Sequence, residues 1–110
     1  MSYDIWMTID TGGPEPACVH AVGNHTSNTS IMWRKVMPET DGLAGIDGKK
    51  GADVLASLRA GYSAMVDRAA EMRAMNPANG WGSYESARAY LLAVVRAAES
   101  HPLAEFRVCR

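Results

Sequence analysis

Two short polar segments contain the side chains of this sequence that could bind a ligand. The first, residues 24–30, reads Asn-His-Thr-Ser-Asn-Thr-Ser, and the second, residues 76–82, reads Asn-Pro-Ala-Asn-Gly-Trp-Gly. Amide and hydroxyl groups form hydrogen bonds without carrying a charge, and an indole offers a flat face on which a planar ligand can stack. The two segments and their flanking aromatics predict a neutral binding site made of Asn24, Thr26, Asn28, Trp33, Asn76, Asn79, Trp81 and Tyr84.

Each polar segment also precedes a predicted helix. Thr29 or Ser30 is a suitable N-cap for a short helix over residues 31–37, and Ser83 is a suitable N-cap for a helix over residues 84–100. The free N–H groups at a helix N-terminus favour an anionic or otherwise electron-rich ligand. The alternative interpretation is structural, because Asn, Ser, Thr and Gly side chains and backbones also close turns and cap helices.

Trp81 is a large apolar residue surrounded by residues that form turns. Pro77 ends the preceding helix, and Asn79-Gly80 tolerates a positive φ angle, so the segment predicts the turn of a helical hairpin. Two interpretations of Trp81 remain open at this point. Either it fills the end of the core between the two helices, or it forms the aromatic wall of a ligand site.

The titratable residues form no recognisable catalytic or metal-binding pattern. No spacing assigns an acid–base role to any histidine or aspartate, and no Gly-x-Ser-x-Gly motif is present. Gly12-Gly13 follows a predicted strand but lacks the Lys-Ser/Thr of a phosphate-binding loop. Cys18, His20 and Cys109 could approach one another, but no fourth metal ligand has a set spacing. We therefore expect no catalytic residue, no metal site and no cofactor.

Apolar periodicity identifies the elements that position the polar segments. Tyr3, Ile5, Met7 and Ile9 alternate with Asp4, Trp6, Thr8 and Asp10, as in a strand with one buried face. The predicted strands are residues 3–10, 17–23 and 103–110, and the predicted helices are residues 31–37, 51–75 and 84–100. We expect an α+β fold in which a small antiparallel sheet, made of a β-hairpin and a C-terminal strand, packs on a helical hairpin. The expected order is β-β-α-α-α-β, with residues 1–110 forming a single domain.

Composition limits the classes of protein to consider. The chain is 47% apolar and 21% charged, with a formal net charge of −1, which is typical of a globular domain. It has no basic run, so we expect no nucleic-acid partner, and no apolar run long enough to span a membrane. The N-terminus lacks the features of a signal peptide, so we expect a cytoplasmic protein whose two cysteines are free thiols, unless their strands are neighbours.

Three motifs together resemble a known family. They are residues 10–16 (Asp-Thr-Gly-Gly-Pro-Glu-Pro), Asn24-x-Thr26-x-Asn28 followed by Met32-Trp33, and residues 76–82 followed by Tyr84-Glu85. This combination resembles a family of small uncharacterised proteins encoded by actinobacteriophages and some related bacteria, and the resemblance covers most of the chain. The family brings no established activity and therefore no catalytic residue. The resemblance implies a phage accessory context, in which small proteins often counter host defence.

Three hypotheses for function follow from these observations. The first is a non-catalytic module that binds a small polar or nucleotide-like ligand, such as a host immune signal, through the two polar segments. The second is a protein-interaction module or homo-oligomer that acts on a host or phage protein through a surface, for example the sheet face that carries Trp6. The third is a small enzyme, which no residue spacing supports. The first hypothesis requires the two polar segments to lie at the same end of the fold.

Overall fold

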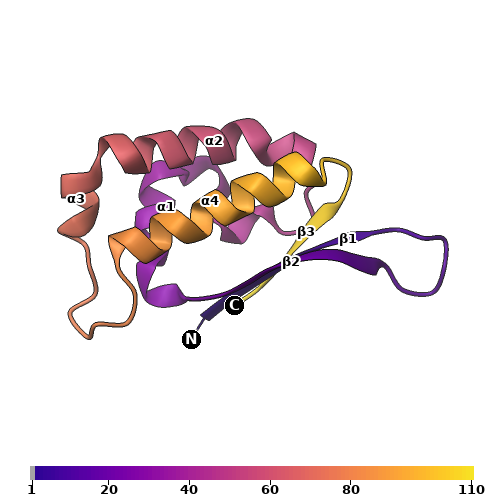
Figure 1. Cartoon of the computed structure of the whole chain (residues 1–110), viewed down its shortest axis with the longest axis horizontal. Helices are drawn as coiled ribbons and strands as arrows, with labels where there is room; N and C mark the ends of the chain where they lie inside the picture. The colour runs from indigo at the N-terminus through magenta and orange to yellow at the C-terminus, as the bar shows by residue number, and fades with distance from the viewer. Residues whose placement is uncertain (1) are drawn as a thin grey trace.

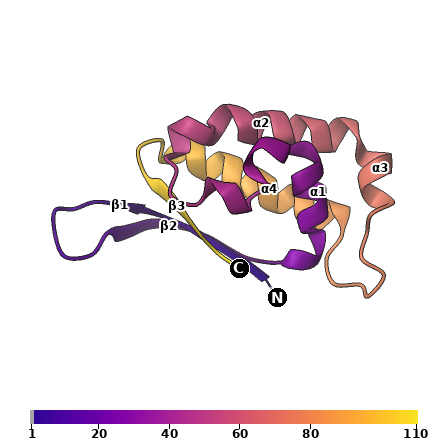
Figure 2. The same ribbon diagram turned by 180° about the vertical axis from the view of Figure 1, so that it is seen from behind.

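A computed structural model, which describes residues 2–110, contains a three-stranded sheet and four α-helices. The elements are β1 (Ser2–Ile9), β2 (Ala17–Thr26), α1 (Ser30–Val36), α2 (Gly51–Asp67), α3 (Ala69–Arg73), α4 (Tyr84–Ser100) and β3 (Glu105–Cys109). The helices all lie on one side of the sheet, and the β1–β2 hairpin extends beyond them as an arm (Figures 1 and 2). The predicted α+β class is confirmed.

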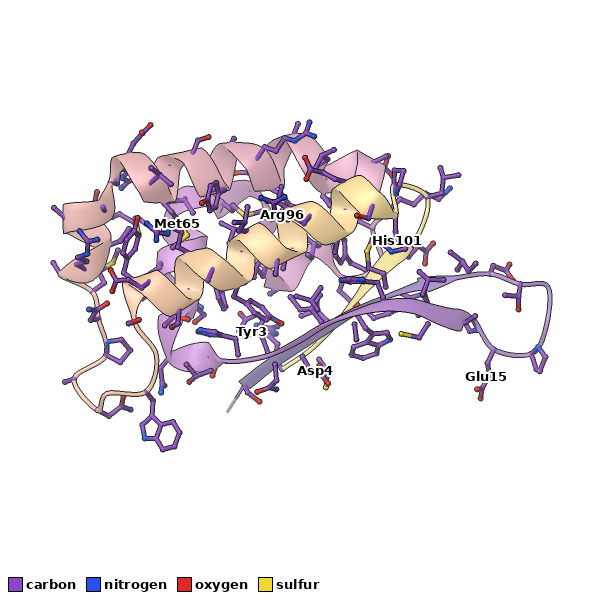
Figure 3. The ribbon with its side chains drawn as sticks, in the orientation of Figure 1. Tyr3, Asp4, Glu15, Met65, Arg96 and His101 are labelled. Atoms are coloured by element: carbon purple, nitrogen blue, oxygen red, sulfur yellow. The ribbon has the colours of Figure 1, made fainter. Side chains whose placement is uncertain are left out.

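The sheet is antiparallel throughout, in the order β2-β1-β3, with β1 in the centre. Over most of β1 the side chains alternate as predicted: Tyr3, Ile5 and Met7 are buried, whereas Asp4 is exposed and Trp6 is half-buried. At the end of the strand the prediction is wrong, since Thr8 is buried and Ile9 is exposed, and the register with β2 shifts between Met7 and Thr8. Tyr3 projects toward the helices and Asp4 projects away from them (Figure 3). Because β1 separates β2 from β3, the two cysteines do not lie on adjacent strands, and both are free.

Strand β2 is longer than the sequence predicted. The prediction ended it at Gly23, but it continues to Thr26 and pairs with β1 as far as Ser2. The first half of the polar segment 24–30 therefore lies on an edge strand instead of in a loop. The pairing of Tyr3 with His25 puts His25 on the same side of the sheet as Tyr3, facing the helices.

The helical hairpin consists of α2 and α4, which pack against each other and enclose the core above the sheet (Figures 1 and 2). The bounds of α4 match the predicted helix 84–100. The predicted helix 51–75 is instead two helices, because Arg68 leaves the helical conformation at φ −107° and ψ 32°. This break turns the short helix α3 across the end of the hairpin, where Met72 is fully buried in the core.

The outer edge of β3 is covered by the segment before α2. Phe106 N–H donates to the Lys49 carbonyl and Gly48 N–H donates to the Phe106 carbonyl, both at 2.8 Å. Val108 N–H donates to Asp47 Oδ1 at 3.0 Å. These bonds satisfy backbone groups that would otherwise remain open on an edge strand. Within residues 2–110, no helix is long and apolar enough to cross a membrane.

Gly51 allows the start of α2 to approach the end of α4. A Cβ atom at Gly51 would lie 2.9 Å from the His101 carbonyl oxygen and 3.1 Å from backbone atoms of Ala98. We therefore expect Gly51→Ala to lower the free energy of unfolding by about 1–3 kcal/mol, because backbone atoms cannot move aside as a side chain can. Urea unfolding measures the loss.

Gly13→Ala is the matched control for this substitution. Gly13 lies in the arm, where an added Cβ meets nothing nearer than Thr11 Oγ1 at 3.6 Å. We expect this variant to keep its stability or to gain up to about 1 kcal/mol, because alanine restricts the unfolded chain. Equal stability of the two variants would contradict the close approach of α2 and α4.

Candidate ligand-binding site

A cavity of about 670 Å³ lies where the two polar segments meet. It is lined by Ser2, Asn24, His25, Thr26, Asn28, Trp81 and Gly82. The first five residues come from the paired ends of β1 and β2 and from the 3₁₀ turn η1 (Ser27–Thr29), and the last two come from the turn before α4. The two polar segments thus lie at the same end of the fold and share one cavity.

Gly82 makes the contact between the two segments. A Cβ atom at this position would lie 2.6 Å from Thr26 Cγ2 and 2.8 Å from Thr29 Cγ2. Gly82 also has a φ angle of +87°, which side-chain-bearing residues adopt at a cost. Glycine is therefore required twice at this position, once by the backbone conformation and once by the neighbouring threonines.

His25 connects the floor of the cavity to the core. Its ring lies 5.5 Å from the Trp33 ring and 5.2 Å from the Tyr90 ring, between centroids. Its Nδ1 atom lies 3.0 Å from the Thr26 carbonyl oxygen, and its Nε2 atom lies 3.1 Å from Ser86 Oγ. Because a carbonyl oxygen only accepts, Nδ1 is assigned as the protonated nitrogen. The imidazole is thus fixed in position from both nitrogens.

The N-terminal cap of α4 belongs to the same network. The predicted N-cap Ser83 accepts a hydrogen bond from Ser86 N–H at 3.2 Å, and Ser83 N–H donates to Ser86 Oγ at 2.9 Å. This reciprocal pair is a capping box with serine at its fourth position. Ser86 Oγ therefore links the start of α4 to His25 at the end of β2.

The turn before α4 is held by its own asparagines. Asn76 Oδ1 accepts a hydrogen bond from Tyr84 N–H at 2.8 Å, and Asn79 Oδ1 accepts one from Trp81 N–H at 2.9 Å. Neither asparagine is part of the cavity lining, and the side chains of both shape the turn. The turn presents Trp81 to solvent with 68% of its surface exposed, which rules out the interpretation that Trp81 fills the core.

Two further predicted site residues are buried in the core. Trp33 and Tyr84 have no exposed surface, and their polar groups bond to the main chain: Trp33 Nε1–H donates to the Ala87 carbonyl, and the Tyr84 hydroxyl donates to the Met65 carbonyl. Burying a large aromatic side chain on the inner face of a helix stabilises the fold, and this stabilisation is lost when the side chain is exposed at a surface site. Trp33 contacts one ring of the cavity lining, the imidazole of His25.

The sequence predicted four of the seven lining residues, namely Asn24, Thr26, Asn28 and Trp81. It missed Ser2, His25 and Gly82. A continuation of the strand pattern past Gly23 would have indicated His25, because the alternation of side chains then places it beside Tyr3. Ser2 becomes part of the lining through strand pairing, and Gly82 through a tertiary contact; neither leaves a signal in the local sequence.

The lining offers uncharged hydrogen-bonding groups. Asn24 Nδ2 donates to Ser2 Oγ at 3.0 Å, which leaves the Asn24 carbonyl oxygen available. Among residues 2–110, the Asn28 side chain forms no hydrogen bond, although Asn28 N–H donates to Thr26 Oγ1 at 3.3 Å. The cavity thus combines amide donors and acceptors with one exposed indole face, and among residues 2–110 no carboxylate, guanidinium or lysine ammonium group lines it.

Other parts of the fold offer less chemistry. His20 and His101 approach each other with 5.4 Å between ring centroids, but within residues 2–110 no three His, Cys, Asp or Glu side chains gather as metal ligands would.

Searches with protein-family models, curated proteins and solved structures find no match to this chain. Its function must therefore be inferred from the geometry and chemistry of the cavity.

Replacing Gly82 tests the contact between the two segments. Gly82→Ala introduces a clash with Thr26 and Thr29 in addition to backbone strain, and we expect it to lower the free energy of unfolding by about 2–4 kcal/mol. Gly80→Ala is the matched control, because Gly80 has a similar φ angle of +76° but no atom within 4 Å of the added Cβ. Its expected loss is about 1–2 kcal/mol. Equal losses in urea unfolding would contradict the contact.

Tyr90 predicts a specific pH dependence. Burial, with a smaller effect of the Asp4 charge, raises the pKa of the Tyr90 hydroxyl, which donates to the Gly23 carbonyl at 2.7 Å. Above about pH 10 the unfolded state loses this proton while the native state keeps it, so stability falls by about 1.4 kcal/mol per pH unit. The Tyr90→Phe variant has no hydroxyl group at this position and therefore does not lose this stability as the pH rises. We expect the stability difference between wild type and variant to shrink as pH rises from about 10 to about 11; a constant difference in urea unfolding would contradict the raised pKa.

Proposed function

We propose that this chain is a non-catalytic binding module for a small polar or nucleotide-like ligand, held in the cavity formed by the two polar segments. The observation that supports this most is the position of Trp81. Its indole is 68% exposed on a turn held by hydrogen bonds, and it lines the same cavity as three uncharged polar side chains from β2 and η1. An exposed aromatic face beside a few convergent polar groups is the usual form of a small-molecule site.

The chemistry of the lining defines the part of the ligand that it would contact. A planar group can stack on Trp81, while the amides of Asn24 and Asn28 offer donors and acceptors to the edge of that group. A nucleobase has both features. The cavity volume of about 670 Å³ falls in the range of about 300–1,000 Å³ found for small-molecule sites.

The resemblance to actinobacteriophage proteins supplies a biological context for this proposal. A phage accessory protein acting in the cytoplasm of the host could counter defence signalling by sequestering a nucleotide signal. A binding module needs no catalytic group for that task, and its effect depends on affinity and abundance alone.

The alternative function is a protein-interaction module or homo-oligomer. The observation that favours it is the sheet face opposite the helices, which no other element covers within residues 2–110 and which carries the half-buried Trp6. Sedimentation of the chain across a range of concentrations tests self-association. A dimer that dissociates on Trp6→Ser, with no ligand bound at the cavity, would favour this alternative.

Titration with uncharged nucleosides tests the proposed site. We expect saturable binding that shifts the NMR signals of the Trp81 indole N–H and the Asn28 side-chain amide. Trp81→Ala should weaken binding by about tenfold to a hundredfold, because stacking of one base on an aromatic side chain contributes about 1–3 kcal/mol.

Leu103→Ala is the control, since Leu103 is a comparably exposed apolar residue, 76% exposed, that lies outside the cavity. We expect it to bind like the wild type. The proposal fails if neither nucleosides nor nucleotides shift the Trp81 and Asn28 signals, or if Trp81→Ala binds as tightly as wild type.

A further inference from the structure

A second cavity adjoins the same 3₁₀ turn. It has a volume of about 360 Å³ and is lined by Tyr3, Ser27, Ser30, Arg34 and Arg110. Strands β1 and β3 pair antiparallel with Asp4 opposite Cys109, which brings the start of β1 and the residue after β3 to the same place. This second cavity is distinct from the first, because the two share no lining residue.

Two arginines line the second cavity. Among residues 2–110, its titratable lining residues are Tyr3, Arg34 and Arg110, and no aspartate or glutamate side chain lines it. The four ion pairs found among residues 2–110 use other arginines, and neither Arg34 nor Arg110 takes part in them. Arg34 Nη1 donates to Ser30 Oγ at 3.3 Å, which directs the guanidinium toward the cavity and leaves its other N–H groups free to bond elsewhere.

Two arginines and two serine hydroxyls form a set of donors suited to an oxyanion. A guanidinium presents parallel N–H donors that match two oxygens of a phosphate, and its charge strengthens each hydrogen bond. Hydroxyl groups can donate to the remaining oxygens. We propose that this cavity binds an oxyanion of the phosphate class, through Arg34 and Arg110 with Ser27 and Ser30.

The position of the second cavity extends the proposed function. Ser2 and Thr26 line the first cavity, whereas the next residue along the chain in each case, Tyr3 and Ser27, lines the second. One lining combines uncharged polar groups with an aromatic face, and the other includes two arginines. A nucleoside phosphate carries a chemical group suited to each lining, and this joint ligand rests on the proposed function; the oxyanion site rests on its own residues and does not require the first cavity to bind a base.

Titration with inorganic phosphate at constant ionic strength tests the oxyanion site. We expect saturable NMR shifts of the Ser27 and Ser30 amides and of the Arg34 side-chain N–H. Arg34→Gln should weaken phosphate binding by about tenfold or more, because it removes a charged donor pair. Arg110→Gln is the second variant and should weaken binding in the same direction.

Arg96→Gln is the control, because Arg96 is an exposed arginine on α4, outside this cavity and outside the ion pairs (Figure 3). It should bind phosphate like the wild type. Weakening by all three variants alike would show general charge attraction and overturn the proposal. Absence of saturable shifts, or unchanged binding in Arg34→Gln and Arg110→Gln, would also overturn it.

The two proposals are separated by the choice of probe. Arg34→Gln should leave the binding of an uncharged nucleoside unchanged, and Trp81→Ala should leave the binding of inorganic phosphate unchanged. Phosphate binding without nucleoside binding would support the oxyanion site and count against the proposed function. Nucleoside binding without phosphate binding would support the proposed function and overturn the oxyanion site.

Discussion

The structure of this end of the molecule depends on the mutual packing of three rings, His25, Trp33 and Tyr90, whose centroids lie 5.2–5.7 Å from one another. The imidazole is held by a main-chain carbonyl on one side and by Ser86 on the other, so it joins the end of β2 to the cap of α4. Tyr90 adds a second bond from α4 to β2 through the Gly23 carbonyl. These contacts fix the sheet edge relative to the turn before α4, and the cavity is the space that remains between them.

The sequence predicted the parts of the fold that local patterns encode. Helix α4 was predicted at both ends because Ser83 caps its start and Pro102 follows its end. The break between α2 and α3 was not predictable from residue types, since the residue at the break is Arg68 and not a proline or glycine. Beyond the break, Met72 is fully buried in the core. The end of β2 was missed because polar residues that pair as an edge strand resemble a loop.

The same distinction explains the outcome at the candidate site. Asn24, Thr26, Asn28 and Trp81 were predicted from chemistry alone, and the fold gathers them. Trp33 and Tyr84 were included because aromatic residues can stack on ligands, but their positions on the inner faces of α1 and α4 bury them. The meeting of Arg34 with Arg110 leaves no signal in the local sequence, because Arg110 follows β3 and reaches the start of β1 only through strand pairing.

The central claim is that a small polar ligand occupies the cavity at Trp81. Native mass spectrometry of the protein purified from cells that express it tests this most directly, because it measures any bound small molecule without assuming its identity. We expect a defined excess mass on the wild type, with the mass of a nucleoside phosphate, that is lost in Asn28→Ala and Trp81→Ala while both variants stay folded. A wild-type mass equal to that of the bare chain, or an excess mass that persists in both variants, would contradict the claim.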